Sequence, residues 1–151
     1  MKKGNRAMEA WLLCFVWMAV IFTMSSMTGE ESGEQSGRIV QILLGIFPGI
    51  EKAISSLELL VRKGAHMLEF AVLFLLYRRA LCFGEKKHAG AMAFGMTMLY
   101  AASDELHQMF VAGRGSSVID VAIDSFGALL AWGAVGLYEK IKKNNKRTFS
   151  E

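Results

Sequence analysis

An uninterrupted apolar run near the start of the chain limits the folds available to it. Residues 10–29, "AWLLCFVWMAVIFTMSSMTG", contain no charged side chain, and Glu9 and Glu30 border the run. About 20 residues at 1.5 Å each cross the hydrocarbon core of a bilayer as one helix. A cleaved signal peptide is the alternative, because basic residues precede the run, but no A-x-A cleavage pattern follows it. The run therefore predicts an uncleaved membrane-spanning helix.

The composition extends this prediction to the whole chain. Hydrophobic residues make up 53% of its 151 residues, a high share for a soluble domain of this size, which has much surface for its volume. We therefore predict a single all-α integral membrane domain over residues 1–151. It would be a bundle of four transmembrane helices plus an extracytoplasmic interfacial or re-entrant helix. The predicted spans are about 10–29, 57–80, 89–110 and 118–138, and the interfacial helix covers about 36–47.

The segment between the first two spans supplies the interfacial helix. Its apolar residues follow helical spacing, and Pro48-Gly49 ends the pattern; they are Ile39, Ile42, Leu43, Ile46 and Phe47. Twelve residues are too few to cross a bilayer, so we expect this helix to lie on or dip into the outer leaflet and to cover a pocket below it. A poorly ordered amphipathic linker is the alternative.

The distribution of charge predicts the orientation. With a cytoplasmic N-terminus, twelve of the seventeen Lys and Arg residues fall on the inner side of the four spans, and ten of the fourteen acids fall on the outer side. Cytoplasmic segments of membrane proteins carry an excess of Lys and Arg, so we predict that both termini are cytoplasmic. Basic clusters such as "EKIKKNNKR" then act as topology anchors that contact anionic lipid, and no nucleic-acid partner is expected.

This topology brings the buried ionisable groups to the outer ends of three spans. Residues three or four apart share one face of a helix, so the polar residues form one stripe on each span. The stripes are Arg62, His66 and Glu69 on the second span, Asp104, His107 and Gln108 on the third, and Asp120 and Asp124 on the fourth. Gly127 and Ala131 continue the last stripe with small residues, which allow membrane helices to approach closely. We expect the three stripes to meet in a polar pocket.

Several of these residues also have a local structural interpretation. Asp120 lies three residues after Ser117, in the spacing of a capping box at the start of the fourth span. Gly113 has the position of a residue that ends the preceding helix. Arg62 and Lys63 have the position of headgroup anchors for the second span.

Asp104 and Glu105 need a partner, because acids near the C-terminal end of a helix oppose its dipole. We expect a cation, either Arg or Lys from a neighbouring helix or a bound metal. Neither Cys14 nor Cys82 begins a metal or redox spacing, so no structural disulfide is expected.

Glu69 and Asp124 are the strongest functional candidates. By helix rise, each lies roughly 6–9 Å below the entrance of its span, where an unpaired carboxylate costs several kcal/mol. Charges at such depth in membrane proteins mark functional sites. The alternative is purely structural: Glu69 pairs with Arg114, and Asp124 pairs with His66 or His107, which fastens helices together and does nothing more.

Two segments resemble the paired signatures of the VanZ-like membrane proteins. They are "RKGAHMLEFAVL" at 62–73 and "SDELHQMFVAGRGSSVIDVAIDSFGALL" at 103–130. The matching positions are Lys63, His66, Glu69, Ser103, Asp104, Glu105, Gln108, Phe110, Gly113, Arg114, Ser117, Asp120, Asp124 and Gly127. Asp124 departs from the pattern, because asparagine is common there, and the extra negative charge favours a cation at the site.

The resemblance covers about residues 10–140 and implies a bacterial plasma-membrane protein, typically from a Gram-positive organism. The family takes its name from a member that lowers susceptibility to the glycopeptide teicoplanin, so a contribution to antibiotic resistance is one implied function. No reaction or cofactor follows from the resemblance.

The residues support three hypotheses about the pocket. In the first, it binds or modulates a cell-envelope ligand, such as a phosphate-bearing lipid headgroup, a lipid-linked wall precursor or a lipoglycopeptide. In the second, the protein is a metal-assisted enzyme acting on a lipid-linked substrate, although no compact ligand motif is present. In the third, it is a small proton-coupled transporter. The first is favoured, the reaction and any cofactor stay unassigned, and a homo-oligomer is left open. The predicted ligand-binding residues are Arg62, Lys63, His66, Glu69, Asp104, Glu105, His107, Gln108, Arg114, Asp120 and Asp124.

Overall fold

The computed structural model describes residues 3–47, 54–84 and 88–148, and all regular structure within them is helical. The helices are α1 (Lys3–Ser25), α2 (Gly29–Ile46), α3 (Ile54–Phe83), α4 (Ala89–Gln108) and α5 (Val118–Thr148). The predicted all-α fold is confirmed, and each predicted helix corresponds to one of these five.

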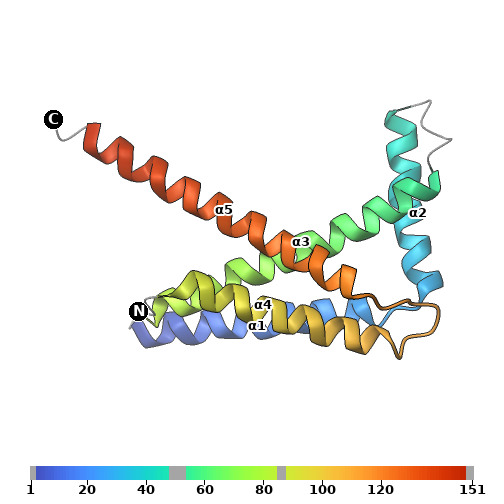
Figure 1. Cartoon of the computed structure of the whole chain (residues 1–151), viewed down its shortest axis with the longest axis horizontal. Coiled ribbons are helices and arrows are strands. Elements are labelled where there is room, and N and C mark those ends of the chain that lie inside the picture. Colours follow the sequence, from blue (N-terminus) through green and yellow to red (C-terminus); the bar gives the residue numbers. More distant parts are fainter. Residues whose placement is uncertain (1–2, 48–53, 85–87, 149–151) are drawn as a thin grey trace.

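Helix α3 organises the arrangement, since it contacts each of the other four helices. In Figure 1, α1 and α4 run side by side, α3 and α5 cross each other, and α2 stands across one end. The C-terminal ends of α1 and α4 and the N-terminal ends of α3 and α5 lie at that same end. We term this region the polar end; it also includes α2 and the loop 109–117.

Two of the helices are long and apolar enough to cross a membrane: α1 over Gly4–Ser25, with mean hydropathy 1.9, and α5 over Val118–Lys146, with 1.6. Helix α3 does not meet this criterion, since it carries Arg62, Lys63 and Glu69 near one end and further arginines near the other. Helix α4 does not meet it either, because Asp104 and Glu105 lie near its C-terminal end and the rest of the helix is rich in alanine and glycine. Apolar character therefore supports two of the four predicted spans.

The boundary between α1 and α2 differs from the prediction. The first span ends at Ser25 and not near residue 29, and α2 begins at Gly29 and not near 36. Thr28 is the N-cap of α2: its hydroxyl accepts from the Glu31 amide at 3.2 Å, and the Glu31 carboxylate accepts from the Thr28 amide at 2.7 Å. These hydrogen bonds from Thr28 hold the pKa of Glu31 below its ordinary value. The reciprocal cap therefore starts a helix in a polar stretch that has no apolar periodicity. The predicted stop at Pro48-Gly49 lies outside the described residues.

The core lies along the face of α3 that α1 and α4 cover. Phe70, Leu73 and Phe74 are fully buried there, at helical spacing. Small residues of α4, such as Ala93 and Ala101, are also fully buried and let the helices pack closely. The outer faces of the helices stay exposed. Leu99 of α4, for example, is 75% exposed.

Helices α3 and α5 are in close backbone contact at Gly127. A Cβ atom at Gly127 would lie 2.1 Å from the Met67 carbonyl oxygen, so only glycine fits there. The predicted close approach along the Asp120–Asp124–Gly127 stripe is thus present. By contrast, a Cβ atom at Gly133, further along α5, would meet nothing within 4 Å.

We predict that Gly127→Ala destabilises the fold and that Gly133→Ala does not. The new methyl group at 127 must push the α3 backbone away, and overpacking of this kind costs about 1–3 kcal/mol. At 133 the alanine improves helix propensity and should leave the stability unchanged or slightly higher. Thermal unfolding of the two purified variants in the same detergent measures the difference. Equal unfolding midpoints would contradict the tight crossing.

Candidate functional site

Two neighbouring cavities occupy the polar end. The main cavity has a volume of about 200 Å³ and lies between α3, α4, α5 and the loop 109–117. Its polar lining residues are Arg62, Lys63, His66, Glu105, Gln108, Arg114, Asp120 and Asp124. The side cavity has a volume of about 70 Å³, lies between α1, α2 and α3, and contains Glu69. Both cavities share the side chains of Arg62, His66 and Arg114.

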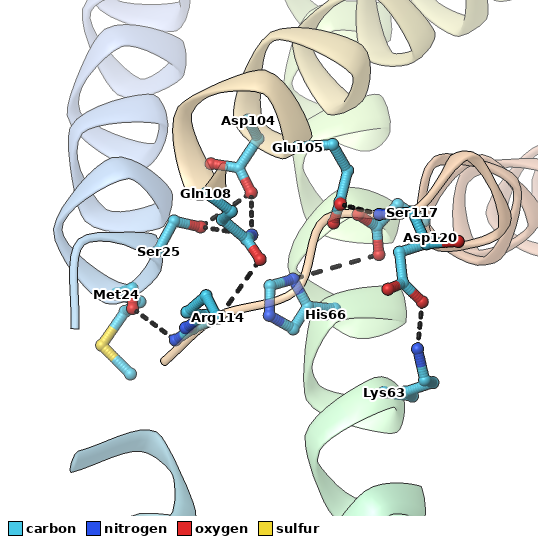
Figure 2. Close-up of polar contacts among 11 residues, drawn as sticks. Met24, Ser25, Lys63, His66, Asp104, Glu105, Gln108, Arg114, Ser117 and Asp120 are labelled. Atoms are coloured by element: carbon cyan, nitrogen blue, oxygen red, sulfur yellow. Dashed lines mark hydrogen bonds and ion pairs between the residues drawn. The ribbon is translucent and has the colours of Figure 1, made fainter. Parts of the chain in front are cut away.

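A hydrogen-bond network joins α1, α4 and the loop beside the main cavity (Figure 2). The carboxylate of Asp104, which is 3% exposed, accepts from the Ser25 hydroxyl at 2.7 Å and from the side-chain Nε2 of Gln108 at 2.8 Å. The side-chain Oε1 of Gln108 then accepts from Arg114 at 3.4 Å. We term Ser25, Asp104, Gln108 and Arg114 the anchor network, since it connects three separate segments of the chain.

Arg114 is mainly engaged by backbone carbonyl groups in the last turn of α1 and just beyond it. Its Nε donates to the Met27 carbonyl at 3.0 Å, and its Nη2 donates to the Met24 carbonyl at 3.1 Å. Carbonyl groups at a helix C-terminus have no partner within the helix, so this guanidinium caps α1. Burial, together with the nearby charge of Arg62, lowers the pKa of Arg114, and surrounding carboxylates oppose that shift. Arg114 therefore has a structural task beside any contact with a ligand.

The acids at the ends of α4 and α5 differ from the sequence interpretation. Glu105 accepts from the Ser117 amide at 3.0 Å, which is the contact that a capping box would give to Asp120. Asp120 instead forms an ion pair with Lys63 of α3. Asp104 and Glu105 were expected to need a cation or a metal. Neutral hydroxyl, amide and backbone N–H groups donate directly to Asp104 Oδ2 and to Glu105, Asp104 Oδ1 has no partner among the described residues, and Arg114 is the nearby cation.

The deepest acids are only partly satisfied. Asp124 is 1% exposed, and its Oδ1 lies 4.0 Å from the Nδ1 of His66, which is an ion-pair distance only when the imidazole is protonated. Its Oδ2 is buried with no hydrogen-bond partner among the described residues, and the same holds for Oε2 of Glu69. Glu69 thus lines the side cavity without the direct ion pair to Arg114 that the structural alternative required.

Arg62 is the cation that the surrounding protein leaves uncompensated. It lines both cavities, yet within the described parts of the chain it makes no hydrogen bond or ion pair, and its Nε is buried. Lys63 and Arg114, by comparison, have protein partners. A guanidinium that faces a cavity without a partner suits a bidentate anion such as phosphate or carboxylate.

Two residues of the predicted pocket, Asp104 and His107, line neither cavity. The ring of His107 stacks on Phe22 at a centroid distance of 4.5 Å, and its Nε2 lies 3.1 Å from the Ser26 hydroxyl, so it faces α1 and lines neither cavity.

Gly113 does not end the preceding helix, which stops at Gln108. It has φ +70° inside the loop, where glycine is favoured.

Helix α2 contributes residues that the sequence interpretation missed. Ser32, Gln35 and Ser36 line the side cavity, in agreement with a helix that covers the pocket. The loop is attached to the start of this helix, since the Gly29 amide donates to the Ala112 carbonyl at 3.0 Å. Two features of the sequence point to these polar positions: Ser32 and Ser36 are four residues apart, and Ser25 interrupts an otherwise apolar run. Neither feature shows which residues these serines contact, because that depends on the tertiary arrangement.

The cavities do not assemble a metal ligand set. Within residues 3–47, 54–84 and 88–148, no group of three or more His, Cys, Asp or Glu side chains is placed to hold a metal ion. The acids are spread over both cavities and the anchor network. The arrangement therefore gives no geometric support to the metal-assisted enzyme.

Comparison with known proteins agrees with the motif resemblance. A family model described as VanZ/LLP1 matches residues 10–139 of the chain. No significant match is found among curated proteins or among solved structures.

We predict that Arg114→Gln lowers stability more than Arg62→Gln. The change at 114 leaves the carbonyl groups of Met24 and Met27 without their charged donor, and hydrogen bonds of charged groups contribute about 1.5–3 kcal/mol. The change at 62 removes a charge that has no protein partner and should be neutral or stabilising. Thermal unfolding in detergent measures both variants. A larger loss of stability for Arg62→Gln would contradict these roles.

Proposed function

Because the chain belongs to the VanZ/LLP1 family, we propose that it is a multi-pass plasma-membrane protein that binds a phosphate-bearing amphiphile of the cell envelope at its polar end. The ligand would be a lipid headgroup, a lipid-linked wall precursor or a lipoglycopeptide. A contribution to glycopeptide resistance, such as lowered susceptibility to teicoplanin in a Gram-positive bacterium, would follow from holding such a ligand.

The burial pattern supports membrane crossings by α3 and α4 in addition to α1 and α5. Their charged residues near the polar end face the cavities or the anchor network and not the outside. Their outer faces are apolar: Leu68 of α3 is 66% exposed and Leu99 of α4 is 75% exposed. Lipid can accept such faces, whereas water would leave a large exposed apolar surface. Helix α1 supplies the buried residues Cys14 and Ile21 to the bundle, which favours retention over cleavage.

The positive-inside rule supports an extracytoplasmic polar end. Arg78 and Arg79 of α3 lie at the opposite end, as do the basic residues Lys140, Lys142 and Lys143 of α5. An excess of Lys and Arg marks the cytoplasmic side. The predicted inner residues Lys2, Lys86 and Lys87, and the outer Lys52, lie outside the described residues.

The uncompensated guanidinium of Arg62 is the observation that carries the phosphate proposal. Lys63 and Arg114 also line the main cavity, so a phosphate there has three cations within its walls. Lys63 and Arg114 are already positioned by Asp120 and by the α1 backbone. A preformed site of this kind spends little binding free energy on ordering side chains.

A proton-coupled carrier is the second candidate. Its support is a set of buried carboxylate oxygens that have no partner among the described residues: Glu69 Oε2, Asp104 Oδ1 and Asp124 Oδ2. All three line the cavities or belong to the anchor network of the polar end, and the described residues hold no further unpartnered buried carboxylate along the rest of a pathway. Proton uptake by reconstituted vesicles, measured with and without a lipid-linked substrate, tests this candidate.

The phosphate proposal predicts that Arg62→Gln weakens the binding of dioleoyl phosphatidic acid to the detergent-solubilised protein. Loss of one charged hydrogen-bond donor corresponds to roughly 10- to 100-fold in affinity. Native mass spectrometry of lipid retention measures it. Arg38→Gln is the control, because the substitution removes the same charge from α2, where the Arg38 side chain is 80% exposed and lines neither cavity. The proposal fails if the wild-type protein retains dioleoylglycerol, which lacks the phosphate, equally well.

The orientation predicts that Gly115→Cys reacts with a membrane-impermeant thiol reagent in intact cells and that His88→Cys does not. Gly115 lies in the polar-end loop with open space around it, whereas His88 precedes α4 at the opposite end. Gly115 is preferable to Gly113, whose φ of +70° disfavours any other residue. A Cys82→Ser background removes the exposed native thiol, since Cys14 is buried. The reverse labelling pattern would place the polar end in the cytoplasm.

A further inference from the structure

An apolar groove follows the seam between α3 and α5. It has a volume of about 400 Å³, within the range of roughly 300–1,000 Å³ that is typical of small-molecule sites. Its lining includes Gly64, Leu68 and Ala71 of α3 and Gly127, Leu130 and Ala131 of α5. Beyond their crossing the two helices diverge, as Figure 1 shows, so one side of the seam is not covered by other helices.

Small side chains leave this groove unfilled. A Cβ atom at Gly64 would meet nothing within 4 Å, so the space beside α3 is open there. Leu68 and Leu130 border it and stay 66% and 53% exposed. Gly127 serves the helix contact, but the open space at Gly64 serves no contact between described residues.

The groove begins where the main cavity ends. On α5, Asp124 lines the cavity, and Gly127, one helical turn later on the same face, lines the groove. The unpartnered, fully buried Oδ2 of Asp124 belongs to the cavity side of this junction. A polar chamber with unsatisfied groups thus continues into an apolar groove, which extends about 11 Å along α5 from Gly127 to Ala134.

We infer that this groove holds an acyl chain of the amphiphile whose phosphate occupies the main cavity, an inference that rests on the proposed function. The ligand class is therefore a membrane-embedded phospholipid or lipid-linked phosphate and not a soluble phosphate. The polar head enters at the level of Arg62 and Asp124, and the chain follows the seam toward Ala134 in the direction that lipid tails take from an outer leaflet.

A second copy of the chain is the competing occupant. A docking helix is about 10–12 Å wide with its side chains, and it requires a broad shallow face of small residues. The α3–α5 seam adjoins the main cavity along α5, where Asp124 and Gly127 lie one helical turn apart. This continuity with the proposed headgroup site favours an acyl chain.

The test compares Gly64→Leu with Gly133→Leu in the full chain. Gly64→Leu fills the groove without a backbone clash, whereas Gly133 is equally open but does not line the groove. The probes are dioleoyl phosphatidic acid and the water-soluble glycerol 3-phosphate, measured by native mass spectrometry. Gly64→Leu should weaken binding of the lipid roughly tenfold, because a blocked slot loses the chain's packing contacts, and should leave glycerol 3-phosphate unchanged. Gly133→Leu should change neither.

Arg62→Gln separates failure of this inference from failure of the proposed function. If it weakens both probes while Gly64→Leu binds the lipid as the wild type does, the phosphate site stands and the acyl-chain site is overturned. If it weakens neither probe, the phosphate site fails, and the inference fails with it. The same spectra report stoichiometry, so a dimer that Gly64→Leu dissociates would assign the groove to a second copy and overturn the inference.

Discussion

The burial of the Asp104 carboxylate is the constraint on which the polar end depends. An ionised carboxylate that is 3% exposed in an apolar bundle costs several kcal/mol unless donors surround it. Ser25 and Gln108 both donate to its Oδ2, and Gln108 in turn accepts from Arg114. Because Arg114 also caps α1, these hydrogen bonds hold the loop that carries it against the C-terminal ends of α1 and α4. That position sets where α5 begins and therefore where its acids face α3.

The crossing of α3 and α5 gives the molecule two features from one cause. Gly127 lets the helices touch, which places the start of α5 beside the start of α3 and permits the ion pair between Asp120 and Lys63. Beyond the contact the helices diverge, and the small residues that allowed the approach leave a slot along the seam. A bulkier seam would fill the slot and would also push the acids of α5 away from the cavity. Close packing and an open groove are therefore compatible at this seam.

The helices could be predicted from sequence because apolar runs and helical spacing are local properties, and so could the gathering of polar residues at one end. The start of α2 was missed because a capping box and not apolar periodicity forms it. Individual partners were missed for a different reason. That Glu105 would take the contact expected for Asp120, or that His107 would stack on α1, depends on which segments lie side by side. Ser25 in its apolar run did not identify Asp104 as its partner, because a serine in an apolar span usually bonds to its own backbone.

The unsatisfied groups of the main cavity constrain the ligand more closely than its charge does. Lys63 and Glu105 already have protein partners, so Arg62 and the Oδ2 of Asp124 are the groups that a ligand must satisfy. A bare phosphate suits Arg62 but brings a second negative charge toward Asp124, which is unfavourable in a site of low dielectric. A headgroup that carries a hydroxyl or ammonium donor beside its phosphate satisfies both groups at once. Under the proposed function, Asp124 therefore favours lipids with a donor-bearing headgroup, and phosphatidic acid, a phosphate monoester, tests the contact with Arg62 alone.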